Sequence, residues 1–444
     1  MTNILLIIDG FNSVVWTYIL PTLFLLLGVY FTILLKAFPQ RHIGYSLSYL
    51  TKTYRSPLPG QGISPVTTLA LALSATIGIG NIIGVLTAIR FGGPGALFWM
   101  WVVGIIGMTL KYAETTLSIR YRQAQSNGYY SGGPMYYLRD GANSKLLANI
   151  FALFAMFGIL LGIGTFPQVH SIIEIFTYTF DTPLFITALV LTFSVGAITL
   201  GGLKSIARIA SIVMPFIIIL FVFGCSYLLI RQVQHIPHAF TLIFRSALGF
   251  EAAAAGSAGY AVRHAIGHGA RRGIFSNESG LGSAAIASAT ANNKVPAKQG
   301  LVHVLEVVID TLVINTLVGL LVIISGAYTL DGPEQALLDL AFKDPTYIGQ
   351  ITMTVSLVFF AFTTIVAWSY YGAQCANFMW GDRGRINFRY IFVFVVFLAA
   401  FVDWATIWTL SDLTTAILVI PNIIGMFILR KDILEETEKL KQSM

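Results

Sequence analysis

Eleven long apolar stretches constrain the fold of this chain more than any other feature of its sequence. A helix that crosses the hydrocarbon core of a bilayer needs about 20 predominantly apolar residues. Stretches of roughly that length cover residues 13–36, 64–90, 95–118, 147–179, 183–201, 205–231, 237–265, 299–328, 349–372, 387–407 and 410–430. We therefore expect an all-α polytopic membrane protein with eleven transmembrane helices. The 147–179 stretch is expected to be one helix, kinked at Pro167.

Charged residues are too scarce for a water-soluble fold of this length. They make up 11% of the 444 residues, whereas soluble domains average about 25%, and 56% of the residues are hydrophobic. A soluble enzyme, a nucleic-acid-binding protein and a disordered scaffold are therefore excluded, and membrane lipids are the expected surroundings. Because no basic segment precedes the first apolar stretch, we expect a retained helix rather than a cleaved signal peptide.

The Lys and Arg residues predict the orientation of the chain. With the N-terminus outside, twenty-two of them fall on the inner side, and only Arg90, Arg231, Arg245 and Lys343 fall on the outer side. Cytoplasmic loops of membrane proteins carry an excess of Lys and Arg. We therefore expect a multi-pass protein of the plasma membrane with its N-terminus outside and its C-terminus in the cytoplasm.

Two of the apolar stretches are unusually rich in glycine. Residues 74–84 read SATIGIGNIIG, and residues 249–260 read GFEAAAAGSAGY. Glycine allows backbone groups to leave the helical ladder and face a ligand. Close helix packing is the alternative for either stretch taken alone. Because the two stretches hold corresponding places in the chain, we predict two interrupted helices around a binding site.

The order of the stretches divides most of the chain into two sets of five helices. The sets cover residues 64–231 and 237–430, after an extra helix and loop at 1–63 and before a cytoplasmic tail at 431–444. A glycine-rich stretch comes first in each set. An odd number of spans makes the second set cross the membrane in the opposite sense. We therefore expect an inverted repeat of five plus five helices.

Six motifs occupy a large part of these stretches. They are ATIGIGNIIGVLTAIRFGGPGALFWMW at 75–101, GMTLKYAETTLSIRYR at 107–122, GGPMYY at 132–137, RRGIFSNESGLGSA at 271–284, QGLVHVLEVVIDT at 299–311 and FAFTTIVAWSYYG at 360–372. They resemble the alanine or glycine:cation symporter family, also called sodium:alanine symporters. The resemblance extends from about residue 64 to 430. It implies a leucine-transporter-like fold and uptake of a small neutral amino acid, coupled to sodium or less often to protons.

The sequence departs from the family pattern at a few positions near the expected pocket. Ile79 stands where the family reads threonine, and Phe166 and Pro167 replace the usual neighbours of Gln168. Serine stands in place of glycine at Ser257. These departures leave the transporter class intact. They leave open which amino acid is carried, and glutamine and serine are the alternatives to alanine and glycine.

The interrupted helices are the expected substrate site. Free backbone N–H groups at a break, backed by the positive end of a half-helix dipole, suit the carboxylate of an amino acid. The candidate substrate-binding residues, two of them supported by the resemblance, are Thr76, Gly78, Gly80, Asn81, Gln168, Gly256, Ser257 and Trp368. Structural roles stay open for three of these: a helix cap for Asn81, an interhelical hydrogen bond for Gln168 and a lipid-facing ring for Trp368.

Sodium, the expected coupling ion, prefers hard oxygen ligands, by analogy with calcium and magnesium. Two adjacent threonine hydroxyls beside freed carbonyl groups meet that preference. The candidate sodium-binding residues are Gly78, Asn81, Thr363 and Thr364. The alternative for the two threonines is a hydrogen bond to a carbonyl group of their own helix. No other metal and no cofactor is expected.

Several charged residues fall inside or close to apolar stretches. Lys111 and Glu114, spaced i,i+3, are expected to form a structural ion pair. In the 276–283 loop, placed on the inner side, Arg271, Arg272 and Glu278 are candidates for gating ion pairs, with a solvated loop as the alternative. The roles of three further carboxylates, Glu251, Glu306 and Asp310, stay open, although Glu306 and Asp310 share a helix face at i,i+4 spacing.

Two other classes remain as distant alternatives. A metal-ion transporter of this fold would need acidic or soft ligands at the breaks, and the segment Gly78–Asn81 offers none. A membrane enzyme would need a catalytic pair or a metal cluster. His264 and His268 have the i,i+4 spacing of zinc ligands, but they lie among arginines and lack a third ligand. The oligomeric state stays open, and a monomer fits the sequence.

Overall fold

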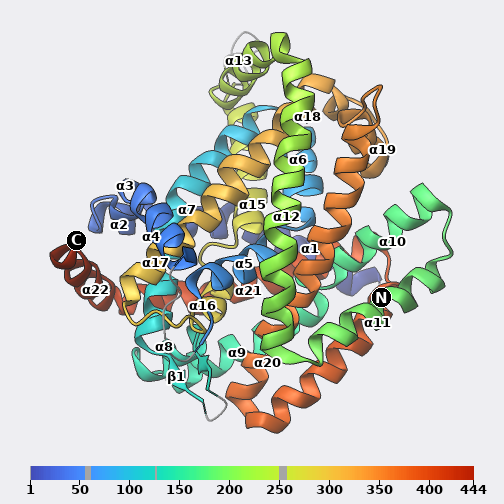
Figure 1. Cartoon of the computed structure of the whole chain (residues 1–444). Helices are drawn as coiled ribbons and strands as arrows, with labels where there is room; N and C mark the ends of the chain where they lie inside the picture. Colours follow the sequence, from blue (N-terminus) through green and yellow to red (C-terminus); the bar gives the residue numbers. More distant parts are fainter. Residues whose placement is uncertain (1, 56–61, 126–127, 250–257) are drawn as a thin grey trace.

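The computed structural model describes residues 2–55, 62–125, 128–249 and 258–444, and helices make up nearly all of it (Figure 1). Four elements are 3-10 or π segments, labelled η, and the two strands are short. In chain order the elements are α1 (Thr2–Val14), η1 (Val15–Ile19), α2 (Leu20–Leu34), α3 (Phe38–Arg41), α4 (Ile43–Arg55), α5 (Pro65–Thr76), α6 (Ile79–Gly92), α7 (Gly95–Arg120), β1 (Gln123–Ala124), β2 (Tyr130–Ser131), α8 (Pro134–Asp140), α9 (Lys145–Leu161), α10 (Phe166–Phe180), α11 (Leu184–Thr199), α12 (Gly202–Arg231), η2 (Val233–His235), α13 (Ile236–Ala247), α15 (Ala258–Asn277), α16 (Ser283–Ser288), α17 (Pro296–Val307), η3 (Val308–Ile314), α18 (Asn315–Ser325), η4 (Ala327–Thr329), α19 (Glu334–Ala341), α20 (Ile348–Ala399), α21 (Trp404–Ile428) and α22 (Arg430–Ser443).

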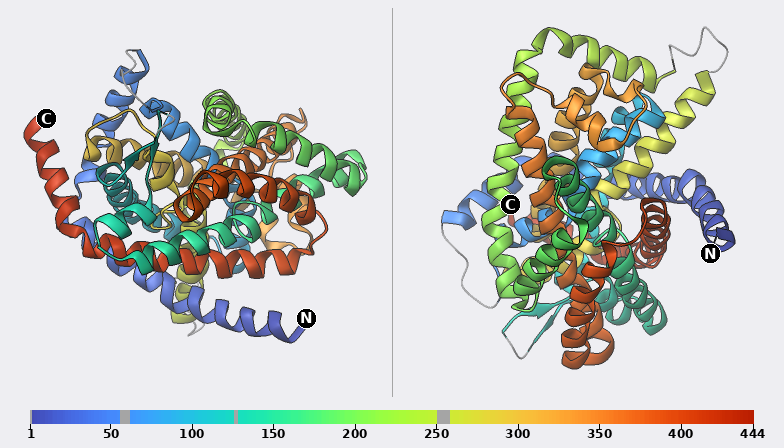
Figure 2. Two further views of the ribbon diagram at one scale, coloured as in Figure 1. Left: turned by 90° about the horizontal axis from the view of Figure 1, so that it is seen from below. Right: turned by 90° about the vertical axis from the view of Figure 1, so that its right-hand side faces the viewer.

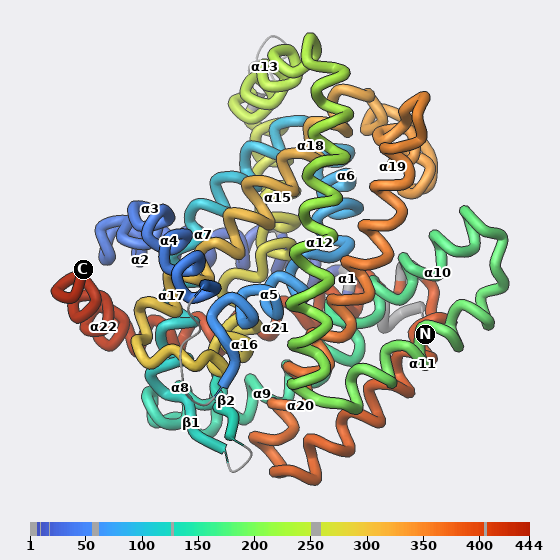
Figure 3. Tube along the Cα trace, viewed as in Figure 1, coloured from blue at the N-terminus to red at the C-terminus, as the bar shows by residue number. Residues whose placement is uncertain are grey.

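The first glycine-rich stretch is an interrupted helix, as the sequence predicts. Helix α5 ends at Thr76, α6 begins at Ile79, and the two are bent by 44°. Ile77 and Gly78, between them, both have extended backbone angles. Both half-helices lie in the middle of the bundle (Figure 3). The backbone of this break is therefore buried and needs hydrogen-bond partners from other helices.

A further break follows the second glycine-rich stretch. The expected span 237–265 is divided between α13 and α15, and most of the glycine-rich segment between them lies outside the described residues. The described break separates α15 from α16, at residues 278–282. Glu278, Gly280 and Gly282 there all have positive φ, which ends a helix. The SNESGLGS segment is thus a buried break rather than a cytoplasmic loop, because its side chains are almost fully enclosed.

The 147–179 stretch also differs from the expected single helix. Residues 162–165 separate α9 from α10, and Gly162 and Gly164 lie inside this short break. Pro167 occupies the first turn of α10, where its missing N–H costs no hydrogen bond. The stretch is therefore a third broken helix, whose two halves together are long and apolar enough to cross a membrane.

The structure does not fix the number of membrane-spanning helices. Among the described residues, six helices are long and apolar enough to cross a membrane, or seven if the bent α5–α6 pair counts as one span. The expected eleven is not established by this test. Two apolar helices, α2 and α11, fall short in length, and the 52-residue α20 joins two helices at Gly381, whose φ is 66°.

The bundle is built around α7, which packs against both α15 and α17, and around the contact of α12 with α20. The N-terminal helix lies along the outside of the bundle, and α22 projects from one edge (Figure 2). Trp16 anchors the N-terminal helix, because its buried indole donates a 3.0 Å hydrogen bond to the Asp412 carbonyl group of α21.

The position of three arginines changes the charge count behind the expected orientation. Arg263, Arg271 and Arg272 lie in α15, before the break, rather than in an inner loop. The other nineteen of the twenty-two cations expected on the inner side lie outside α15. The excess of Lys and Arg therefore still favours an outer N-terminus.

Cysteine labelling in intact cells checks this orientation. Tyr347 and Tyr54 are 68% and 76% exposed, and they lie in loops expected outside and inside, respectively. A membrane-impermeant maleimide is expected to label Tyr347→Cys but not Tyr54→Cys, and to label both after detergent is added. The parent protein is the control, because Cys225 and Cys375 are buried. Labelling of Tyr54→Cys alone in intact cells would show that the chain has the opposite orientation.

Candidate functional site

The break between α5 and α6 is closed by side chains from two other helices and from α6 itself. The Gly78 N–H donates to Asn81 Oδ1 at 3.0 Å, and the Ile79 N–H donates to Gln168 Oε1 of α10 at 3.2 Å. Thr364 of α20 donates its hydroxyl to the Ile77 carbonyl group at 3.2 Å. All of these groups are buried. The break therefore exposes backbone donors and acceptors to three polar side chains rather than to lipid.

Glycine is required at position 78 by close approach. A Cβ atom there would lie 2.9 Å from Thr364 Oγ1 and 3.0 Å from Gln168 Oε1. Any larger residue would displace both side chains from the break. Gly78 thus fixes how tightly α10 and α20 close over α5 and α6.

Trp368 joins this break to the one between α9 and α10. It lies one turn after Thr364, on the same face of α20, and its Nε1 donates to the Ala75 carbonyl group at 3.3 Å. A Cβ on Gly164, within the α9–α10 break, would lie 2.6 Å from Trp368 Cγ. The predicted residues Gly78, Gln168 and Trp368 are therefore brought together around two helix breaks.

A second polar cluster lies on the other side of Asn81. The Asn81 Nδ2 group is 2.5 Å from Asp310 Oδ1, 2.8 Å from Asn315 Oδ1 and 3.0 Å from Ser276 Oγ. Ser276 and Thr311 donate their hydroxyls to Asp310 Oδ2 at 2.9 Å and 2.7 Å. All five side chains are completely buried. Asp310 is therefore a buried carboxylate whose hydrogen-bond partners are all neutral.

The sequence analysis left the role of Asp310 open and missed Ser276. The residues come from three elements, α15, η3 and the start of α18, so no local spacing reveals the cluster. Glu306 lies in α17, whereas Asp310 lies in the π-helical segment η3 that follows it. Its wider turn changes the register of the face, and Glu306 bonds to Lys111 whereas Asp310 bonds to Asn81.

The remaining predicted site residues that the structure describes take no part in the hydrogen bonds that close the break. Thr363 turns away from the break and bonds to carbonyl groups of its own helix and to Met214 of α12. Thr76 likewise bonds back to the Ala72 carbonyl group at 3.1 Å. Gly80 packs against Phe275 of α15. Three further predicted residues, Glu251, Gly256 and Ser257, lie outside the described residues.

Lys111 is the centre of a third buried cluster. Its Nζ atom is 2.9 Å from Glu306 Oε1 and 3.9 Å from Glu114 Oε1. His303 Nδ1 is 3.0 Å from Glu306 Oε2. Glu114 Oε2 accepts hydrogen bonds from the Gly282 N–H at 3.0 Å and from Asn422 at 2.9 Å. The cluster therefore ties α7 and α17 to the α15–α16 break and to α21.

The expected gating pair between Arg272 and Glu278 does not form in this structure. Glu278 accepts a 2.6 Å hydrogen bond from Ser283, and the Arg272 guanidinium lies 4.3 Å from the centre of the Trp408 ring. Arg271 pairs instead with Asp412 of α21.

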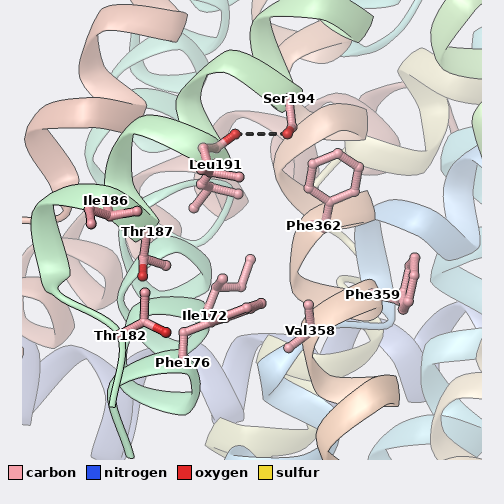
Figure 4. Close-up of a pocket in the computed structure, with 11 residues that line it drawn as sticks. Ile172, Phe176, Thr182, Ile186, Thr187, Leu191, Ser194, Val358, Phe359 and Phe362 are labelled. Carbon is pink, nitrogen blue, oxygen red and sulfur yellow. Dashed lines mark hydrogen bonds between the residues drawn. The ribbon is translucent and has the colours of Figure 1, made fainter. Parts of the chain in front are cut away.

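An apolar pocket lies elsewhere, between α10, α11 and α20 (Figure 4). It encloses about 350 Å³. Its walls carry no charged side chain, and the Ser194 hydroxyl bonds to the Val190 carbonyl group of its own helix. The residues that line it are Ile172, Phe176, Thr182, Ile186, Thr187, Val190, Leu191, Ser194, Val358, Phe359 and Phe362. None of the predicted site residues belongs to it, and it offers no charged group to a zwitterion.

Broken helices that meet at buried polar groups define a class of protein. They are the construction of secondary transporters, which bind substrate and coupling ion near the middle of the membrane. The whole-chain fold agrees with this class. The crystal structure of MhsT in complex with L-phenylalanine superposes with a TM-score of 0.62, covering 86% of this chain and 93% of that one at 15% identity. The expected leucine-transporter-like architecture is therefore confirmed.

Sequence comparisons identify the family within this class. The model of the sodium:alanine symporter family matches residues 1–444. The chain is 36% identical to the sodium/alanine symporter AgcS of Methanococcus maripaludis, over 98% of this chain and 97% of that one. It is 41% identical to an uncharacterized transporter of Haemophilus influenzae, over 99% and 96% of the two chains. It is 32% identical to a probable sodium/glutamine symporter, GlnT, of Bacillus subtilis, over 95% and 87%.

The chain belongs to the sodium:alanine symporter family. It is an integral membrane transporter and not an enzyme, as the sequence analysis predicts. The substrates named for its relatives differ, so membership of the family does not by itself fix the amino acid.

Replacing Gly78 tests whether close packing holds the break. Gly78→Ala is expected to lower the free energy of unfolding by about 1–3 kcal/mol, because the methyl group displaces Thr364 and Gln168. Thermal unfolding of the protein in detergent measures this loss. Gly267→Ala in α15 is the matched control, because a Cβ there meets nothing within 4 Å. Equal unfolding temperatures for the two variants would contradict the packing.

Proposed function

We propose that this protein is a sodium-coupled symporter of a small neutral amino acid of the alanine or glycine class. The single observation that carries the proposal is the pair of polar surfaces at one helix break. One surface offers backbone N–H groups at Gly78. The other offers the buried carboxylate of Asp310, which is bonded to Asn81, three residues after Gly78. A zwitterion and a cation need these two kinds of group.

The substrate carboxylate is proposed to bind at Gly78 and Ile79. In the present structure these N–H groups donate to Asn81 and Gln168. A bound carboxylate would take the place of the Gln168 oxygen and leave the Gln168 amide free to donate to it. The positive end of the α6 dipole favours an anion at this position. Trp368 would then close the pocket beside the substrate side chain.

The sodium ion is proposed to bind next to Asn81, with Asp310 as its charged ligand. A buried carboxylate is costly without a counter-charge, and the hydrogen-bond partners of Asp310 are all neutral. A cation at this point would neutralise the carboxylate and attract the substrate carboxylate across the break. Thr364, with the carbonyl group of Ile77, offers further oxygen atoms at the break.

The alternative is transport of another neutral amino acid, such as glutamine or serine, on sodium or protons. It is supported by the relative described as a probable sodium/glutamine symporter. Competition by unlabelled amino acids during uptake separates these substrates. The proposed orientation has the N-terminus outside. An inward sodium gradient would drive uptake, because ion and substrate move in the same direction.

Uptake into proteoliposomes tests the proposed site. With an inward sodium gradient at fixed membrane potential, radiolabelled alanine is expected to enter saturably. Asn81→Ala and Thr364→Ala are each expected to reduce uptake about ten- to hundredfold, since a hydrogen bond to a charged group contributes about 1.5–3 kcal/mol. Ser194→Ala is the control, because Ser194 bonds only within α11. Full activity of both site variants would remove the site.

The sodium dependence of Asp310→Asn tests the cation site separately. This variant keeps the size of the side chain and removes its charge. The sodium concentration for half-maximal uptake is expected to rise about tenfold or more, because one charged ligand is lost. Asp181→Asn is the matched control, since Asp181 lies in the left-handed region at φ 50°, which asparagine also adopts. An unchanged sodium dependence of Asp310→Asn would show that the ion binds elsewhere.

A further inference from the structure

The buried cluster around Lys111 has no role in the proposed symport, and its charges do not balance. It holds the carboxyl groups of Glu114, Glu278 and Glu306, the ammonium group of Lys111 and the imidazole of His303. Each of these side chains is at most 1% exposed. With all three carboxyl groups ionised, a single ammonium group leaves two excess negative charges in a region closed to water. Such an excess is not sustained in a low-dielectric interior, so the cluster must hold protons or another cation.

The hydrogen bonds indicate which carboxyl group carries the proton. Glu306 is paired with Lys111 and His303, and Glu114 receives two donated hydrogen bonds in addition to the nearby ammonium group. Among the described residues, the Glu278 carboxyl group bonds to the Ser283 hydroxyl, which is able either to donate or to accept. Glu278 is therefore the carboxyl group with the least compensation for a negative charge.

A further buried polar group faces the same place. The Tyr371 hydroxyl of α20 has no hydrogen-bond partner among the described residues, although the side chain is only 1% exposed, and the charges of Glu278 and Glu306 act on it. A second oxygen of the cluster, Glu114 Oε1, also lacks a hydrogen bond within the described part of the chain. Both are buried polar atoms without a hydrogen-bond partner among the described residues, which is uncommon in a protein interior.

We propose that Glu278 binds a proton in this closed arrangement and releases it when the α15–α16 break opens. Glu278 has φ 52°, and Gly280 and Gly282 after it are also left-handed, so the break is held by its contacts rather than by helical bonds. The Gly282 N–H is bonded to Glu114, so a shift of α16 against α7 separates the two and admits water to Glu278. Transport is then linked to protons as well as to sodium.

Charged and titratable groups from every neighbouring element set the pH response of this site. Helix α7 contributes Lys111 and Glu114, α17 contributes His303 and Glu306, and η3 contributes Asp310. The tyrosines nearest to the carboxylates come from α8 and α20 and are Tyr137 and Tyr371. Glutamine at position 278 imitates the protonated carboxyl group and cannot release the proton.

Infrared difference spectroscopy tests proton binding without reference to transport. Purified protein is compared before and after addition of sodium and alanine, in the carbonyl-stretching region of protonated carboxylic acids. A band that changes in the parent protein is expected to vanish in Glu278→Gln and to persist in the matched control Glu174→Gln on α10. A band unchanged by Glu278→Gln would overturn the proposal.

Uptake at a series of pH values tests the coupling and rests on the proposed transport function. At a fixed sodium gradient, the parent protein is expected to change its rate about tenfold per pH unit beyond the midpoint, as one proton requires. Glu278→Gln is expected to vary less than about twofold over the same range. The proposal would be overturned if Glu278→Gln kept the pH profile of the parent protein. It would also be overturned if uptake by this variant depended on one sodium ion fewer, since the site would then bind sodium.

Ser283→Ala keeps the proposal falsifiable if Glu278→Gln fails to fold. This variant leaves the charge of Glu278 unchanged and removes its hydrogen bond, so the midpoint of the pH profile is expected to move. An unmoved midpoint would overturn the proposal. Absence of sodium-driven uptake in the parent protein would instead contradict the proposed symport, and the infrared band would remain as the measure of proton binding.

Discussion

The need to satisfy backbone polar groups away from water governs this structure. Where α5 gives way to α6, the carbonyl group of Ile77 and the N–H groups of Gly78 and Ile79 leave the helical ladder in the middle of the bundle. Lipid offers no hydrogen bonds, so α10 and α20 must supply them through Gln168 and Thr364. This requirement draws four helices together at one point. A ligand that binds there replaces partners the protein already provides, and binding is thereby coupled to how the helices close.

The two other polar clusters extend this logic to charge. Asp310 is surrounded by neutral donors and needs a cation, whereas the cluster around Lys111 contains an ammonium group and still has too many carboxyl groups. Both clusters contact the end of α15 or the break that follows it. Events at the α5–α6 break and at the α15–α16 break therefore share a common element, α15. Ser276, near the end of α15, belongs to the Asp310 cluster, and Glu278, in the break that follows, belongs to the Lys111 cluster.

Much of the site followed from glycine and polar residues in apolar stretches. Gly78 stood out because glycine weakens a helix, Asn81 and Gln168 because lipid tolerates polar amides poorly, and Trp368 because it follows Thr364 by one turn. The structure brings these four residues together. The break at residues 278–282 was not predicted, although the glycines at 280–282 give the same local signal as those at 249–260. Only burial distinguishes a break within a bundle from a loop at its surface. Thr363 was grouped with Thr364 for a similar reason, since adjacent positions on a helix look equivalent until the neighbouring helices are known.

The sequence by itself determined that the chain is a helical membrane protein, where its first helix break falls and to which family it belongs. These properties depend on local composition and on motifs, which neighbouring residues suffice to specify. Only the tertiary structure decided that Asp310 meets Asn81, that Lys111 meets Glu306, and that Glu278 lies in a buried break. Such pairings join residues up to about 230 positions apart, as between Asn81 and Asp310. They depend on which helix faces pack together, and burial then decides whether a polar residue is a solvated side chain or a site.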